Sequence, residues 1–197
     1  MAGALGARMS AQESPAAYRI QPTASRFTVK AFAAGLLAAM GHNPTFAIRD
    51  YSGEAGFTGD ELAHPYLRIT ARAQSLEDTD DVSQKDKQDI EARLKEQVLE
   101  AARFADIAFE SASVTPSKVG ENLYGVNIIG NLTLHGFTRS ETIRAQLSLS
   151  GDSFRAFGEF SLRQTDYGIK LVSVAGGSLK VKDEVKVSFD IVARKQE

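Results

Sequence analysis

Apolar and polar residues alternate with a period of two along most of this chain, as in strands that bury one face and expose the other. The alternating segments are residues 24–33, 44–57, 66–75, 106–114, 123–136, 141–150, 153–163 and 184–194. Turn-forming residues such as Gly53, Gly136 and Gly151 separate or interrupt them. The pattern predicts about eight strands.

Two of the expected strands are long for a globular protein. Residues 123–135 and 184–195 each fit a single strand, against a usual length of ~5–6 residues, and would reach roughly 40 Å at ~3.3 Å per residue. Open edges of that length invite aggregation, so closure into a barrel is the natural solution. The sequence therefore predicts a mainly β fold, an elongated eight-stranded antiparallel barrel. A barrel of this size is either filled by its own side chains or holds one ligand, and a long barrel favours a long guest.

One segment follows a helical period instead. Ile90, Leu94 and Val98 are spaced four residues apart and are surrounded by charged and polar residues. This predicts one amphipathic helix over about 83–104, laid on the barrel or across one of its mouths. Ser83 is the expected N-cap, because Asp86 three residues later resembles a capping box.

A second segment, residues 33–41, is a run of small and apolar residues without strand alternation. It is too short to cross a membrane. We expect a short apolar helix or turn that caps one end of the barrel. Such a segment would suit an apolar portal, since methionine adapts to varied partners, and it would equally suit a buried connection between two strands.

The composition is that of an ordinary globular protein, with 43% hydrophobic and 24% charged residues and a net charge of −2. This balance lacks the basic footprint of a nucleic-acid-binding protein, and no segment is apolar enough for a transmembrane helix. The absence of cysteine excludes disulfides, thiolate metal sites and a cysteine nucleophile. We expect a flexible leader over residues 1–17 and one barrel domain over 18–197. No secretion signal is evident, so we expect a cytoplasmic protein, or a periplasmic one if a signal has been removed.

Catalytic and metal-binding patterns are missing from the sequence. His42, His64 and His135 are isolated and lack the spacing of a metal motif, so we expect no metal site. No nucleophile elbow and no glycine-rich phosphate loop is present. Acidic pairs such as Asp80 and Asp81 lie at element ends, where solvated charges are common. We therefore expect no enzymatic activity and no cofactor other than a bound lipid.

Several stretches, taken in order, resemble the YceI-like family of lipocalin-like polyisoprenoid-binding proteins. The resemblance covers the chain from about residue 18 to the C-terminus, with the helix in the corresponding place. The stretches that carry it are "FAIRDYSGEAGF" (46–57), "ARFADIAFESASV" (102–114), "GNLTLHGFTRSETIRAQL" (130–147), "FSLRQTDYGIK" (160–170) and "SLKVKDEVKVSFDIVAR" (178–194).

The resemblance implies a lipocalin-like barrel whose apolar lumen holds a long-chain isoprenoid, such as a polyprenyl phosphate or a quinone. Inward-facing residues would then line the lumen, and we expect at most about half of those named here to touch the guest. The predicted lumen residues are Phe27, Val29, Phe46, Ile48, Phe109, Val126, Ile128, Phe160, Val187 and Phe189. The predicted portal or head-group residues are Leu36, Leu37, Met40, His42 and Arg163.

The leading hypothesis is thus a non-enzymatic carrier or store of an isoprenoid lipid. Two alternatives remain open at this point. The barrel could be an enzyme that acts on a lipid at its mouth through His42 or Asp166, or a packed barrel without a lumen that serves as a stress-related interaction module. A homodimer is compatible with this fold, but the sequence does not fix the number of subunits.

Overall fold

The chain folds into a closed antiparallel barrel of eight strands, as predicted. The computed structural model describes residues 15–34, 43–59, 61–174 and 179–197. Around the barrel the order is β1, β5, β6, β8, β9, β10, β11 and β14, and β14 pairs with β1 to close it. These strands are β1 (Ala16–Ile20), β5 (Tyr51–Thr58), β6 (Ala63–Arg72), β8 (Asp106–Gly120), β9 (Leu123–Leu134), β10 (Phe137–Ser150), β11 (Ser153–Arg163) and β14 (Glu184–Lys195).

Three shorter strands extend the sheet at one end of the barrel. β2 (Arg26–Lys30) continues from β1 along β14, β4 (Thr45–Ile48) pairs with β2, and β7 (Leu76–Asp78) pairs with β4. They are separated from β1, β5 and β6 by short interruptions. The 3₁₀ turn η1 (Pro22–Ala24) follows β1, and η2 (Ala73–Ser75) follows β6.

The interruptions lie side by side. The backbone N–H of Arg49 donates to the carbonyl of Ser75 (3.1 Å), and that of Arg72 donates to the carbonyl of Asp50 (2.9 Å). The sheet is therefore interrupted at the same level in neighbouring strands. Beyond this level β7 pairs with β4, and among the described residues it does not pair with β8.

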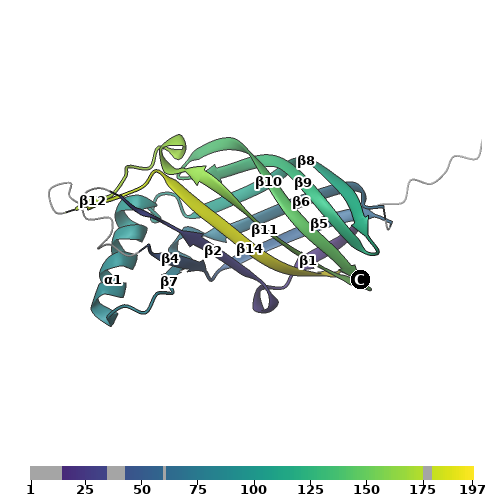
Figure 1. The fold of residues 1–197 in the computed structure, drawn as a ribbon, viewed down its shortest axis with the longest axis horizontal. Coiled ribbons are helices and arrows are strands. Elements are labelled where there is room, and N and C mark those ends of the chain that lie inside the picture. Colours follow the sequence, from purple (N-terminus) through teal and green to yellow (C-terminus); the bar gives the residue numbers. More distant parts are fainter. Residues whose placement is uncertain (1–14, 35–42, 60, 175–178) are drawn as a thin grey trace, which may run out of the picture.

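The predicted helix lies at this end of the barrel and contacts β7 (Figure 1). It comprises α1 (Gln84–Arg93), continued by a π-helical turn η3 (Leu94–Val98). The cap is confirmed, since Ser83 Oγ accepts a hydrogen bond from the backbone N–H of Asp86 (3.1 Å). The predicted end at residue 104 is wrong. The helix ends at Val98 because Glu100 adopts a left-handed backbone with φ of 44°, which interrupts the helix.

A small sheet of β3 (Ala33–Ala34), β13 (Leu179–Val181) and β12 (Ser173–Val174) lies at the same end, opposite the C-terminus (Figure 1). The first two residues of the predicted apolar helix or turn therefore belong to a strand. Residues 35–41 of that segment lie outside the described residues, as do residues 1–14 of the predicted leader. The barrel itself begins at Ala16, two residues before the expected domain boundary.

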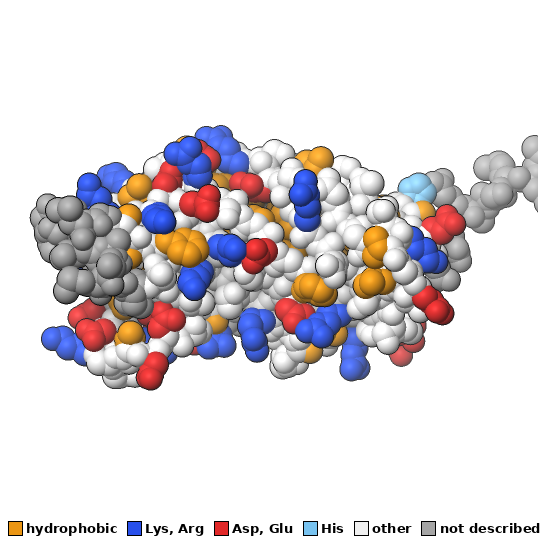
Figure 2. All heavy atoms as spheres, viewed as in Figure 1, with side chains coloured by type: hydrophobic (Ala, Val, Ile, Leu, Met, Phe, Trp, Pro, Cys, Tyr) orange, Lys and Arg blue, Asp and Glu red, His pale blue; other side chains and the backbone are white. Residues whose placement is uncertain are grey.

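Side chains alternate between the inside and the outside of the barrel, as the sequence pattern predicts. On β14, Val185, Ile191 and Ala193 are buried. The outer face carries ion pairs between neighbouring strands, such as Arg155 with Asp190 (2.7 Å). Figure 2 shows basic and acidic side chains interspersed over one face of the molecule, with hydrophobic side chains between them. Among the described residues no helix is both long and apolar enough to cross a bilayer.

A buried polar cluster ties the helical segment to the barrel. The ring of His135 donates from Nδ1 to the carbonyl of Tyr167 (3.1 Å), and its Nε2 lies 3.2 Å from Oε1 of Glu100, two residues after η3. Tyr167 is 0% exposed, and its hydroxyl donates to Oε1 of Glu141 (2.6 Å). Burial, together with the hydrogen bond to the Glu141 carboxylate, raises the pKa of Tyr167 above its usual value of 10.0.

Inside the barrel, Gly130 on β9 makes room for the ring of Phe109 on β8. A Cβ at position 130 would collide with that ring and would lie 2.6 Å from the carbonyl oxygen of Glu110. Gly125, on the same strand, has no such neighbour, because its nearest atoms would be 4.0 Å from an added Cβ. The Phe109 ring can therefore occupy this position only because residue 130 is a glycine, which has no Cβ.

Replacing Tyr167 with Phe should weaken the fold at neutral pH and remove one source of alkaline destabilisation. The native state disfavours the tyrosinate, so the wild-type free energy of unfolding should begin to fall once the unfolded tyrosine ionises, above about pH 10. The stability difference between wild type and Tyr167→Phe should be constant from pH 7 to 9. It should then shrink by up to ~1.4 kcal/mol per pH unit. Urea unfolding from pH 7 to 11 measures this, and a constant difference across the range would contradict it.

Gly130→Ala should lower the free energy of unfolding by ~1–3 kcal/mol, because the backbone and the Phe109 ring must move to admit the methyl group. Gly125→Ala is the matched control on the same strand, and it should be neutral or stabilising by up to ~1 kcal/mol. Urea unfolding of both variants tests the difference. Equal effects would show that close packing at Gly130 is not what requires a glycine.

Candidate functional site

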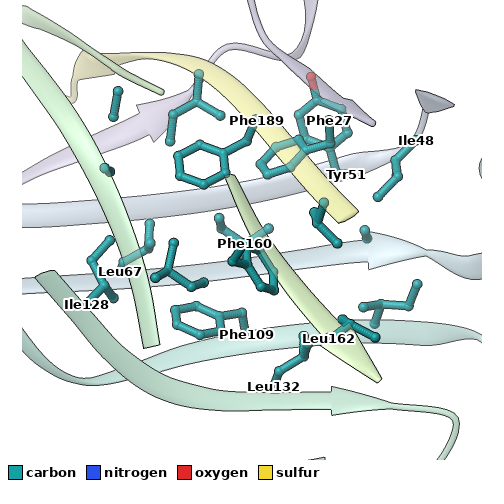
Figure 3. A pocket seen from close by; sticks show the side chains of 18 of the residues that line it. Phe27, Ile48, Tyr51, Leu67, Phe109, Ile128, Leu132, Phe160, Leu162 and Phe189 are labelled. Carbon is teal, nitrogen blue, oxygen red and sulfur yellow. The ribbon is translucent and has the colours of Figure 1, made fainter. Parts of the chain in front are cut away.

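The inward faces of the barrel enclose one elongated apolar cavity with a volume of about 230 Å³. Its lining comes from strands all around the barrel and from the helical segment, which contributes Leu94 and Val98. Figure 3 shows Phe27, Phe109, Phe160 and Phe189, from four different strands, directed into this common space. The barrel therefore has a lumen, and the alternative of a packed barrel without one does not describe this structure.

All ten residues predicted from the sequence to face the lumen line the cavity. They are Phe27, Val29, Phe46, Ile48, Phe109, Val126, Ile128, Phe160, Val187 and Phe189. Their position is thus established, whereas their contact with a guest stays a prediction. Val98 and Leu99 are buried and also line the cavity, so the lining continues from the barrel into the end of the helical segment.

The predicted portal residues have a different outcome. Leu36, Leu37, Met40 and His42 lie outside the described residues. Arg163 is not part of the cavity lining, because its side chain is 66% exposed and its Nε pairs with Oδ2 of Asp183 (2.9 Å). Arg163 could therefore contact the head group of a ligand only outside the lumen.

The sequence interpretation missed several lining residues. Ile143, Leu147 and Leu132 line the cavity and belong to alternating apolar sets, so the period of two contained the signal for them. Tyr51 and Gln164 also line it, but their polar groups gave no sign that they face inward. Asp166, considered for the enzyme alternative, does not line the cavity.

Three aromatic rings of the lining contact one another. Phe27 meets Tyr51 edge to face at a centroid distance of 4.8 Å, and Phe189 lies 6.3 Å from Phe27. The hydroxyl of Tyr51 donates to the carbonyl of Pro22 (3.2 Å), so it is turned toward the wall. Burial raises the pKa of Tyr51. This tyrosine therefore presents a neutral ring to the cavity.

A second aromatic cluster narrows the end of the barrel that is remote from α1. Tyr18 stacks on Phe57 with a centroid distance of 4.6 Å, and Phe154 lies 5.4 Å from Tyr18. All three residues are buried, and they come from β1, β5 and β11. Ring packing of this kind is favourable beyond the area that it buries. The cluster gives the lumen a firm apolar boundary at this end.

Among the residues that the structure describes, the cavity lining contains no lysine, arginine, histidine, aspartate or glutamate. Its side-chain polar groups belong to Tyr51, Tyr66 and Gln164. Nor do the described residues contain a cluster of three or more His, Asp or Glu side chains that could hold a metal ion. An uncharged, almost wholly apolar lining suits an apolar guest, since burial removes hydrocarbon surface from water.

Comparison with solved structures finds the same fold in several proteins. BcnA from Burkholderia cenocepacia has a TM-score of 0.64 at 18% identity, and the match covers 88% of this chain and 98% of BcnA. A polyisoprenoid-binding domain from Saccharophagus degradans, implicated in plant cell wall breakdown, has a TM-score of 0.65 at 16% identity, covering 92% and 99% of the two chains. A Campylobacter jejuni YceI protein reaches 0.55 at 15% identity, covering 76% and 84%.

No curated protein matches the chain by sequence. The model of one protein family does match, that of the YceI-like domain, over residues 18–193. This span begins within β1 and ends within β14, so it includes every strand of the closed barrel. The lumen, the closed barrel and this match together show that the chain belongs to the YceI-like family.

Proposed function

We propose that this protein binds a long-chain isoprenoid lipid, of the polyprenyl phosphate or quinone type, inside its lumen and carries or stores it. The observation that carries the proposal is the elongated cavity, whose described lining is almost wholly hydrocarbon and aromatic and contains no charged group. The structural neighbour from Saccharophagus degradans is named as a polyisoprenoid-binding domain. Membership of the YceI-like family supports the same class of ligand.

The driving force for binding is the burial of the lipid chain. Each Å² of apolar surface removed from water contributes ~25 cal/mol, and this gain is offset by the lost freedom of the flexible chain. A branched isoprenoid has few polar atoms, so an apolar lumen removes almost all of its surface from water at little desolvation cost.

The lumen must widen when a long lipid enters. Its volume of about 230 Å³ is below the ~300–1,000 Å³ of typical small-molecule pockets. Phe160 lies near the middle of the lining in Figure 3. Phe160 and Phe189 are only partly buried and pack against the core from inside the barrel. We expect rotations of these rings to make room for the chain.

The proposed role involves no chemistry on the lipid. Acid–base catalysis needs an ionisable group within hydrogen-bond reach of the reacting atom, and the described lining offers none of the usual carboxylates, histidines or lysines. The lipid would therefore leave the protein as it entered.

Protein purified without detergent should carry its lipid. Native mass spectrometry should show a population heavier than the polypeptide, and denaturation should release a compound with the mass of a prenyl lipid. Protein refolded from denaturant is the control and should lack this extra mass until lipid is added. Repeated recovery of the bare polypeptide, which then also fails to take up prenyl lipid, would refute the proposal.

Filling the lumen should block lipid uptake without destroying the fold. Ile128→Trp places a large ring among the lining side chains, and Val187→Trp does the same from β14. Overpacking costs ~1–3 kcal/mol of stability, and lipid affinity should fall at least ~10-fold, which corresponds to ~1.4 kcal/mol. Titration with a fluorescent lipid measures affinity, and thermal unfolding checks the fold.

Ile129→Trp is the matched control for Ile128→Trp. Ile129 is the next residue on β9, and it faces outward with 39% of its surface exposed. Its replacement adds the same ring outside the barrel and should leave uptake unchanged. Binding in the lumen would be contradicted if both variants lost uptake to the same extent, or if neither variant lost it.

A further inference from the structure

Gln164 is a buried polar residue on the cavity wall. It begins the 3₁₀ turn η4 (Gln164–Tyr167), directly after β11, and it is only 8% exposed. Leu162, Ile169 and Val185 line the cavity with it. An amide in such a position needs hydrogen-bond partners, because a buried polar group without one is costly.

The amide nitrogen of Gln164 has its partner in the wall. Nε2 donates to the carbonyl oxygen of Lys182 (2.8 Å). Because that carbonyl can only accept a hydrogen bond, the orientation of the amide is fixed, and Oε1 is turned away from Lys182. Among the described residues no group donates a hydrogen bond to Oε1. The side chain therefore leaves one strong, neutral acceptor for a group inside the cavity.

A second unpartnered oxygen lies toward the same end of the barrel. Asp78 is 1% exposed, and its Oδ2 is buried without a hydrogen-bond partner in the described structure. Asp78 follows Leu76 by two residues, so strand alternation places it on the same face of β7 as this cavity-lining leucine. Asp78 itself is not part of the cavity lining, so the acceptor that a guest can reach there is Oε1 of Gln164. The described lining offers no cation to an anionic head group.

We propose that Gln164 is a specificity-determining residue, which selects an isoprenoid with an uncharged, hydroxyl-bearing head over the corresponding phosphate. The hydroxyl donates to Oε1 of Gln164, while the chain lies along the lumen. A phosphate in the same place would lose its hydration, find no positive charge in the described lining and face the amide oxygen of Gln164, which repels it. This inference rests on the binding of an isoprenoid in the lumen, as proposed above. Among isoprenoids it favours a hydroxyl-bearing head, as in a prenyl alcohol or a quinol, over a phosphate or an oxidised quinone.

The experiment compares three ligands that share one chain. A C20 prenyl alcohol, its monophosphate and the C20 hydrocarbon without a head group each displace a fluorescent lipid from the intact protein. The alcohol should bind at least ~10-fold more tightly than the phosphate, and ~3- to 10-fold more tightly than the hydrocarbon, as one hydrogen bond implies. Alcohol and phosphate of equal affinity, or a tighter phosphate, would overturn the inference.

Two substitutions at Gln164 test the residue itself. Gln164→Leu should reduce the affinity for the alcohol to that for the hydrocarbon and leave the hydrocarbon unaffected. Gln164→Arg can still donate to the carbonyl of Lys182 and adds a positive charge, so it should shift the preference toward the monophosphate. An unchanged ratio of alcohol to phosphate affinity in Gln164→Arg would overturn the assignment even if Gln164→Leu failed to fold.

Tyr66→Phe is the control for a neutral polar group elsewhere in the lining. Tyr66 lies on β6, with its ring against Gly56, near the end of the barrel remote from α1. Its replacement should leave the preference for the alcohol unchanged. If Tyr66→Phe lost the preference for the alcohol and Gln164→Leu kept it, the head group would lie at the end of the barrel remote from α1. That result would overturn the inference. Failure of all three ligands to bind wild-type protein would refute the proposed function itself.

Discussion

Pairing of β14 with β1 is the interaction on which the rest of this structure depends. Tyr18 lies opposite Lys195 and Ile20 opposite Ala193, and this short antiparallel ladder joins the first strand to the last. Without it the alternating strands would form an open sheet with one apolar face exposed to water and two free edges. With it, every inward side chain faces others across a common space. The lumen, its apolar lining and its separation from the charged outer face all follow from closure.

Closure of the barrel does not by itself determine whether the lumen is empty or filled with side chains. In this protein the sizes of the inward-facing residues determine it. Ala55, Ala71, Ala145 and Ala156 line the cavity between much larger phenylalanines, and Gly130 accommodates the ring of Phe109. Protein interiors normally pack to high density, so small residues without large partners opposite them leave room. The cavity therefore follows from the distribution of side-chain volume around the barrel, which depends on register between strands.

This distinction explains what the sequence could and could not predict. A period of two identifies the side chains of one strand that share a face, such as Val126 and Ile128 on β9, or Val187 and its alternate neighbours on β14. The predicted strands and lumen residues therefore agree with the structure. The end of the helix depended on the left-handed backbone of Glu100, for which glutamate gives no signal. The bend at Arg49 and Asp50 is set by pairing with neighbouring strands, and a linear pattern does not contain that information.

Gln164 illustrates the same limit for the site, since a polar residue after a strand is ordinarily expected to face solvent. Its position inside follows from tertiary contacts, because η4 is held by the backbone N–H of Gln164 bonded to the carbonyl of Asp183 and by the buried ring of Tyr167. In a lining of hydrocarbon, shape and hydrophobicity distinguish poorly between lipids of similar chain length. A single buried acceptor discriminates far more sharply, because a guest that cannot donate to it leaves it unsatisfied. Selectivity in such a barrel therefore concentrates at its rare polar positions, while affinity comes from the apolar residues that surround them.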